Sequence, residues 1–149
     1  MPLRRSGSDS RDCLTEAQVI AYQKVLSGPK NSKGESLNPG YPPGAEDGGS
    51  GWQTWISGPG QPLPPANGAP AQFMFEDQFL RFFLFSNPRY DSMTFNFDTD
   101  VATVRATDAT LSAINPDLRP FKARGGKLIV WHGWSDHALT ADRSVQYYN

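Results

Sequence analysis

The stretch GGKLIVWHGWSDHALTADRSVQYY, residues 125–148, decides the fold of this chain. Residues 127–132 form a short apolar run with two β-branched side chains, a pattern typical of a buried strand in a parallel sheet. Residues 133–137 form a short, mostly polar loop, and Thr140 can then cap a helix that runs to Tyr148. The predicted order is strand, loop, helix. In open α/β sheets, ligands and catalytic groups lie in that loop.

Composition and charge exclude several classes of protein. The chain has 149 residues, the size of one domain, and its 14 Gly, 13 Pro and 12% aromatic residues indicate a loop-rich fold with large apolar rings. A formal net charge of −1 leaves no excess of Lys and Arg for general binding to nucleic acid or an anionic membrane. No apolar run approaches the ~20 residues that cross a bilayer. The single cysteine, Cys13, excludes a disulfide-stapled fold and a multi-cysteine zinc site.

The N-terminal half predicts a disordered start, a helix and a long loop. Residues 1–12 are polar and charged, which is typical of disorder. The following segment predicts a helix with Thr15 as its N-cap, Gln18 as the capping-box partner and Gly28 at its end. Residues 29–70 hold most of the Gly and Pro and have no regular hydrophobic period, so a long loop is predicted there.

Two groups of aromatic side chains each allow two interpretations. The rings of the long loop either pin it to a neighbouring surface or line a ligand pocket. They are Tyr41, Trp52 and Trp55. A second group recurs at helical spacing, in a helix predicted to end at Asn87-Pro88. Its members are Phe75, Phe79, Phe82 and Phe83. This stripe either packs into a core or forms a wall of a pocket for an aromatic ligand. A further helix is predicted over residues 98–114.

The loop after the predicted strand holds the candidate catalytic group. Ser135, Asp136 and His137 are the three residue types of a hydrolytic triad, but consecutive residues cannot form one, because triad members come from separate segments. Asp136 suits the acid that orients a catalytic histidine. The alternative is that it only closes the turn or caps the next helix. A metal site at His132 and His137 is not expected, because no other cysteine and no carboxylate cluster accompanies them.

Four segments resemble the tannase and feruloyl esterase family of α/β-hydrolases. The tail matches a G-G-K-L strand, then H-G-x-x-D, then a helix with a tyrosine pair. The front segment CLTEAQVIAYQKVLSGPKNSKGESLNPGYPPGAE, residues 13–46, is similar to the start of the family's lid. GWQTWISG at residues 51–58 and FLRFFLF at residues 79–85 are also similar to lid segments. The resemblance covers residues 13–149.

The resemblance implies a partial α/β-hydrolase, with one core strand and helix and a loop-rich, mainly helical lid. Residues 13–115 would be a partial lid domain and residues 116–149 a C-terminal piece of the hydrolase core. Asp136 matches the acid of the family's Ser–Asp–His triad. The family's serine lies in a C-S-x-G-G segment and its histidine lies next to a cysteine, and this chain contains neither segment. The chain alone is therefore expected to be inactive.

The resemblance also implies a substrate class and a binding site. The parent enzyme would be a secreted or periplasmic serine hydrolase of phenolic esters, feruloyl, galloyl or similar. The lid would supply an aromatic slot, with Arg81 facing a carboxylate or phenol of the substrate. The candidate slot residues are Trp52, Trp55, Phe79, Arg81, Phe82 and Phe83.

No cofactor is expected. The family's lid calcium loop would lie just before Cys13, where this chain has SGSDSRD, and the upstream cysteine that the family would pair with Cys13 is absent. Nucleic acid and membrane are not expected partners, whereas self-association through unpaired strand edges is. Two other classes stay open. One is a non-catalytic module that binds aromatic compounds or sugars, and the other is a small protein that forms oligomers.

Overall fold

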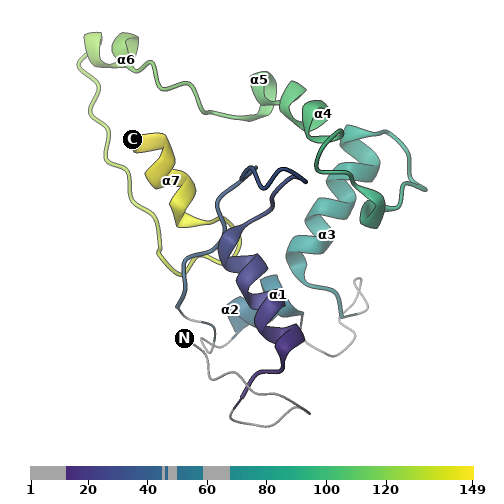
Figure 1. The fold of residues 1–149 in the computed structure, drawn as a ribbon. Helices are drawn as coiled ribbons and strands as arrows, with labels where there is room; N and C mark the ends of the chain where they lie inside the picture. Colours follow the sequence, from purple (N-terminus) through teal and green to yellow (C-terminus); the bar gives the residue numbers. More distant parts are fainter. Residues whose placement is uncertain (1–12, 45, 47–49, 59–67) are drawn as a thin grey trace.

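The computed structural model describes residues 13–44, 46, 50–58 and 68–149, so the predicted disorder of residues 1–12 lies outside the described part. The described fold is mainly helical (Figure 1). Its elements are α1 (Glu16–Ser27), α2 (Ser50–Trp52), the π-helix η1 (Gln53–Ser57), α3 (Ala71–Gln78), the π-helix η2 (Phe79–Leu84), the 3-10 turn η3 (Ser92–Thr94), α4 (Val101–Ala106), α5 (Asp108–Leu111), α6 (Arg119–Ala123) and α7 (Ala141–Tyr148).

The first helix confirms its sequence signals. The Gln18 N–H donates to Thr15 Oγ1 at 3.3 Å, and the Thr15 N–H donates to Gln18 Oε1 at 2.8 Å, which completes a capping box. Gly28 follows α1 with φ 70°, a conformation that favours glycine. A Cβ there would lie 2.3 Å from the Asn38 carbonyl oxygen. Gly28 therefore ends α1 and lets the following loop fold back against it.

Other helices differ from the sequence prediction in their limits. The predicted loop of residues 29–70 contains α2 and η1, and α6 was not predicted. The helix predicted over residues 98–114 is present as α4 and α5, separated at Thr107. The Thr107 hydroxyl donates to the Val104 carbonyl oxygen at 2.7 Å. Side-chain bonds of this kind compete with the helical backbone pattern, which explains a break at this position.

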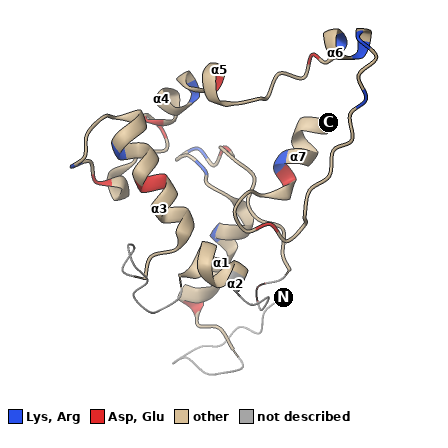
Figure 2. Ribbon diagram, turned by 180° about the vertical axis from the view of Figure 1, so that it is seen from behind, with Lys and Arg blue, Asp and Glu red and all other residues tan. Residues whose placement is uncertain are grey.

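The predicted buried strand of the tail is wrong for this chain. Residues 127–132 are extended but join no strand ladder. Elsewhere in the described residues an isolated antiparallel bridge pairs Lys30 with Ser36, and Cys13 and Leu14 also lie in bridge positions. Ile129 and Trp131 are 87% and 86% exposed. A strand buries its side chains only between neighbours, and the described residues supply none. In both ribbon views α6, which carries Arg and Lys, lies at the end of two extended segments, away from α1 and α3 (Figures 1 and 2).

The phenylalanine stripe does not form a core here. Phe75, Phe82 and Phe83 are all more than half exposed. In the described part of the chain the buried apolar residues are Leu80 and Ala141. Few of the described elements pack against α3 and η2, so most of the stripe stays exposed.

Candidate functional site

Asp136 lies in the loop between the extended segment and α7. Its Oδ1 accepts hydrogen bonds from the N–H groups of Ala138 (2.9 Å) and Leu139 (3.0 Å). Its Oδ2 lies 3.3 Å from His132 Nε2, and the Asp136 side chain is 36% exposed. The bond from the Leu139 N–H is the main cause that lowers the Asp136 pKa, with further contributions from Ala138 and His132. The carboxylate therefore closes the turn and stays ionised.

Segments far from the tail in sequence hold this loop in place. Thr140 Oγ1 donates to the Gly40 carbonyl oxygen at 2.5 Å, and the Tyr41 hydroxyl donates to the Ala138 carbonyl oxygen at 3.1 Å. Gln72 of α3 donates its Nε2 to the His137 carbonyl oxygen at 3.3 Å. The sequence predicted that Thr140 caps α7, and it does occupy the N-cap position, but its hydroxyl bonds to Gly40 instead. Hydrogen bonds thus hold the loop to the segment of Gly40 and Tyr41 and to α3.

His137 packs the same loop against α2. Its ring meets the Trp52 ring edge-on, with centroids 5.9 Å apart and an interplanar angle of 87°. A Cβ at Gly51 would lie 2.6 Å from His137 Nδ1, so only glycine allows this approach. Trp52, a predicted slot residue, therefore contacts His137, the residue that follows Asp136 in the sequence.

A pocket opens directly beside the Asp136 loop. Its volume is about 490 Å³, and it is lined by Trp55, Gln72, Phe75, Glu76, Ala138 and Leu139. The Trp55 and Phe75 rings stack with centroids 5.7 Å apart and planes within 6° of parallel. Glu76 lines the pocket, and its partial shielding from solvent raises its pKa, with Asp77 adding to the rise. We call this cavity the Trp55 pocket.

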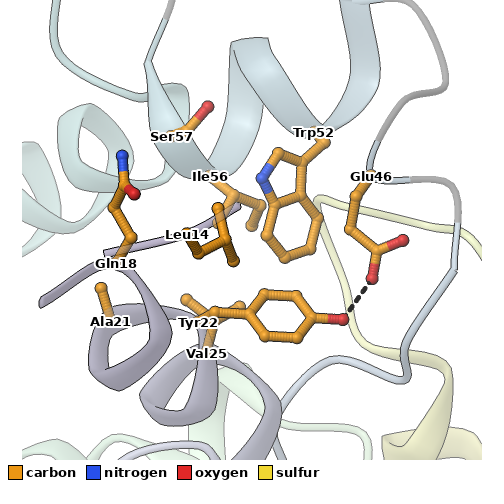
Figure 3. A pocket seen from close by; sticks show the side chains of 9 residues that line it. All are labelled: Leu14, Gln18, Ala21, Tyr22, Val25, Glu46, Trp52, Ile56 and Ser57. Atoms are coloured by element: carbon orange, nitrogen blue, oxygen red, sulfur yellow. Dashed lines mark hydrogen bonds between the residues drawn. The ribbon is translucent and has the colours of Figure 1, made fainter. Parts of the chain in front are cut away.

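A second pocket lies between α1 and η1 and is largely apolar (Figure 3). Its volume is about 540 Å³, and Trp52 forms part of its wall together with Tyr22 of α1. The Tyr22 hydroxyl donates to Glu46 Oε1 at 2.7 Å. This bond is the main cause that raises the Tyr22 pKa to about 12, and it lowers the Glu46 pKa. The Tyr22 and Trp52 rings are tilted, with centroids 6.0 Å apart.

The remaining predicted slot residues make other contacts. Arg81 Nε lies 2.9 Å from Oδ1 of Asp77, a buried carboxylate that also accepts from Ser92 Oγ at 2.6 Å. The Phe79 ring stacks on the Phe83 ring at 5.3 Å. These residues and Phe82 do not line the Trp55 pocket. The structure therefore brings Trp52 and Trp55 to the Asp136 loop and places the other four predicted residues elsewhere.

Several residues of this site were not among the predicted slot residues. Phe75 belongs to the helical stripe and Tyr41 to the loop rings, and a pocket wall was one of the two interpretations of each group, whereas Gln72 carried no signal in the sequence. The hydrogen bonds of Gln72 and Tyr41 to this loop join positions 65 and 97 residues apart. Spacing along the chain does not encode such contacts. The strand, loop and helix order of the tail and its match to a known motif pointed to this loop, but not to the segments that hold it.

No group of three or more His, Cys, Asp and Glu side chains in the described residues is placed to hold a metal ion. None of the described helices has the length and apolar character needed to cross a membrane. Cys13 forms no disulfide. The expected loss of the calcium loop concerns residues 6–12, which lie outside the described part.

Comparison with known proteins defines the class of protein. The family model for tannase and feruloyl esterase matches residues 3–149. The chain therefore belongs to the tannase and feruloyl esterase family, whose members are carboxylic ester hydrolases. This confirms the family that the tail and the N-terminal segments predicted.

Individual relatives agree with this placement. An uncharacterized esterase of Xanthomonas campestris pv. campestris is 31% identical over 96% of this chain and 26% of its own length. The mono(2-hydroxyethyl) terephthalate hydrolase of Piscinibacter sakaiensis is 30% identical over 95% of this chain and 27% of its own length. The crystal structure of feruloyl esterase B from Aspergillus oryzae matches with a TM-score of 0.73 and 29% identity, over 98% of this chain and 27% of that chain. This chain spans about a quarter of the length of these relatives.

Proposed function

We propose that this chain supplies the triad acid and part of the substrate slot of a serine ester hydrolase that acts on phenolic esters. Asp136 is the acid in this proposal. The single observation that carries it is the position of the Trp55 pocket, which shares Ala138 and Leu139 with the turn that holds the Asp136 carboxylate. An aromatic group in that pocket would lie beside the residue that orients the catalytic base.

The proposed reaction follows the chemistry of serine esterases. A serine oxygen attacks the ester carbonyl carbon, a histidine takes the serine proton, and the alcohol leaves with that proton, which leaves an acyl-serine that water then hydrolyses. Asp136 holds the histidine in the correct tautomer and stabilises its charged form. The pKa of Asp136 is lowered, so it is ionised at neutral pH as this role requires. The serine and histidine belong to family segments that this sequence does not contain.

The Trp55 pocket suits a planar aromatic acyl group. The near-parallel Trp55 and Phe75 rings offer flat apolar surfaces, and aromatic groups prefer such stacked arrangements. Gln72 and Glu76 are the polar side chains that line the pocket, and the Glu76 carboxylate can meet a phenolic hydroxyl. Relatives named feruloyl esterase have 28% and 29% identity to this chain, which supports a phenolic acyl group as the substrate class.

We also propose that residues 127–132 form a strand of the complete hydrolase sheet. The segment is extended, and Leu128, Ile129 and Trp131 expose more than half of their surfaces. Side chains of this kind are buried when neighbouring strands pair with both edges. In this proposal residues 13–115 form part of the lid, and the location outside the cytoplasm stays a prediction.

A chimera tests the proposal. Residues 13–149 replace the matching segment of feruloyl esterase B from Aspergillus oryzae, which supplies the rest of the fold. We expect the chimera to hydrolyse methyl ferulate and to react with a fluorophosphonate probe. The chain alone should do neither, because it lacks the activated serine. A folded chimera without hydrolysis, or turnover by the chain alone, would contradict the proposal.

A further inference from the structure

His132 makes three polar contacts that join the end of the extended segment, the Asp136 loop and α7. Its Nδ1 lies 2.7 Å from Ser144 Oγ in α7. Its Nε2 lies 3.0 Å from the Leu139 carbonyl oxygen and 3.3 Å from Asp136 Oδ2. The His132 side chain is 20% exposed, so the imidazole is mostly shielded from solvent. Ser, His and Asp from three positions of the chain thus meet at one ring.

The chemistry of these partners fixes the proton on Nε2. Both groups that face Nε2 are oxygen acceptors, and neither can donate a hydrogen bond. Nε2 must therefore carry a hydrogen and share it between the two acceptors. In the neutral imidazole Nδ1 then has a free lone pair, which the Ser144 hydroxyl satisfies as donor. All hydrogen-bonding atoms of the ring are paired in this arrangement.

We propose that His132 is a positioning residue for Asp136: its Nε2–H holds Oδ2 of the carboxylate, and Ser144 fixes the tautomer from the other side. The inference rests on the proposed function in one respect, since Asp136 acts there as the triad acid. The two N–H groups of Ala138 and Leu139 occupy Oδ1. Oδ2 faces the Nε2–H of His132 on one side, and a carboxylate oxygen can accept two hydrogen bonds. One acceptor position of Oδ2 stays open for the catalytic imidazole.

The charged and titratable groups near His132 agree with this role. Asp136 is the carboxylate in contact with the ring. Arg143 and Tyr147 of α7 line a pocket together with His132. The Tyr147 hydroxyl donates its hydrogen bond to the Asn115 carbonyl oxygen and not to His132. The other histidine, His137, is turned toward Trp52, and its Nε2 has no hydrogen-bond partner. His132 is therefore the histidine that can hold Asp136, although His137 is its direct neighbour in sequence.

The tautomer of His132 gives a first test in the unmodified 149-residue chain, with Ser144→Ala as a supporting variant. Long-range proton–nitrogen NMR correlations distinguish a protonated Nε2 from a protonated Nδ1. We expect Nε2–H in the neutral ring at high pH, and replacement Ser144→Ala should change the Nδ1 chemical shift and leave Nε2 protonated. A neutral ring with its proton on Nδ1 would overturn the proposal, whatever the activity of the chimera.

Paired variants test the effect on Asp136. His132→Leu removes the donor, so the Asp136 carboxyl should titrate at a higher pH in carbon NMR, whereas His132→Gln keeps an N–H at the same reach and should restore part of the shift. His137→Gln is the matched control and should leave the Asp136 titration in place. In the chimera, His132→Leu should lower kcat by up to about 10²-fold with little change in KM, since a misplaced orienting group impairs the transition state and spares binding. His132→Gln should recover most of that loss.

The outcomes separate this inference from the proposed function. An inactive chimera with an Nε2–H tautomer and a shifted Asp136 titration contradicts the proposed function and supports the role of His132 in holding the carboxylate. An active chimera whose kcat is unchanged by His132→Leu, with an unmoved Asp136 titration, overturns the positioning role and leaves the proposed function standing. If His132→Leu does not fold, the tautomer of the unmodified chain decides.

Discussion

Thr140 donates a 2.5 Å hydrogen bond to the carbonyl oxygen of Gly40, a residue 100 positions earlier in the chain. Thr140 is only 5% exposed, so this bond is shielded from water. A Cβ at Gly40 would lie 2.2 Å from the Leu26 carbonyl oxygen, so the backbone can approach this closely only at glycine. The loop after α1 and the loop that holds Asp136 are thereby fixed to each other.

Replacement of Thr140 should loosen the Asp136 loop. Thr140→Val keeps the shape but leaves the Gly40 carbonyl without its donor, which costs about 1–3 kcal/mol for a buried acceptor. We expect faster hydrogen exchange at the amides of Ala138 and Leu139 in this variant. Thr140→Ser keeps the hydroxyl and is the control, with exchange close to the original rate. Equal exchange in all three proteins would show that this bond does not hold the loop.

Tyr22 should ionise only at strongly alkaline pH. The folded-state pKa of Tyr22 is about 12, above its ordinary value of about 10. Its contribution to stability is therefore fully present below about pH 10 and is lost as the pH rises through the folded-state pKa. Ultraviolet absorbance of the phenolate should show one tyrosine that ionises late. Glu46→Gln should bring this ionisation to lower pH, and Tyr22→Phe should remove it. A late tyrosine that persists in Tyr22→Phe would contradict the assignment.

The Trp55 pocket should bind an aromatic ligand in the chain alone. Ferulate esters should quench tryptophan fluorescence with saturation, because the Trp55 ring forms one wall of the pocket. Trp55→Leu should weaken this binding by about tenfold, the effect of losing about 1.4 kcal/mol of stacking. Trp131→Leu is the control, since Trp131 is 86% exposed and does not line the pocket. Equal weakening in both variants would indicate nonspecific adsorption to exposed rings.

The exposed segment 127–132 should cause self-association in the chain alone. Unpaired extended backbone with apolar side chains is prone to pair with another copy. Sedimentation equilibrium should show a mass that rises with protein concentration above the 16.4 kDa of one chain. Ile129→Lys with Trp131→Lys should keep the chain monomeric, as charged side chains disfavour edge pairing. A monomer at every concentration, with a sharp cooperative melt, would contradict the expected unpaired strand.

Local sequence signals predicted the local structure well. The capping pair Thr15 and Gln18 and the stop at Gly28 gave α1, and Thr140 correctly marked the start of α7. These features depend on neighbours within a few residues. The helix break at Thr107 was missed, because it arises from a side-chain bond that competes with the backbone rather than from a Gly or Pro.

Features that depend on distant contacts could not be read from spacing. The apolar pattern of residues 127–132 is that of a buried strand, but the described residues supply no second strand, so the segment stays exposed. Trp55 stacks on Phe75, and Ser144 bonds to His132. No sequence pattern predicted either contact. The residue pattern left Asp136 either as a catalytic acid or as a turn residue, the family resemblance favoured the acid, and the role of Asp136 as triad acid stays a prediction.

The turnover of the chimera with Asp136→Asn tests the central claim most directly. Asparagine keeps the size of the side chain but cannot stabilise a charged imidazole. We expect kcat for methyl ferulate to fall by about 10⁴-fold, the scale seen for the aspartate of a serine-protease triad, with an unchanged circular dichroism spectrum. Near-normal turnover of the folded Asp136→Asn chimera would contradict the account and leave Asp136 as a residue that only closes a turn.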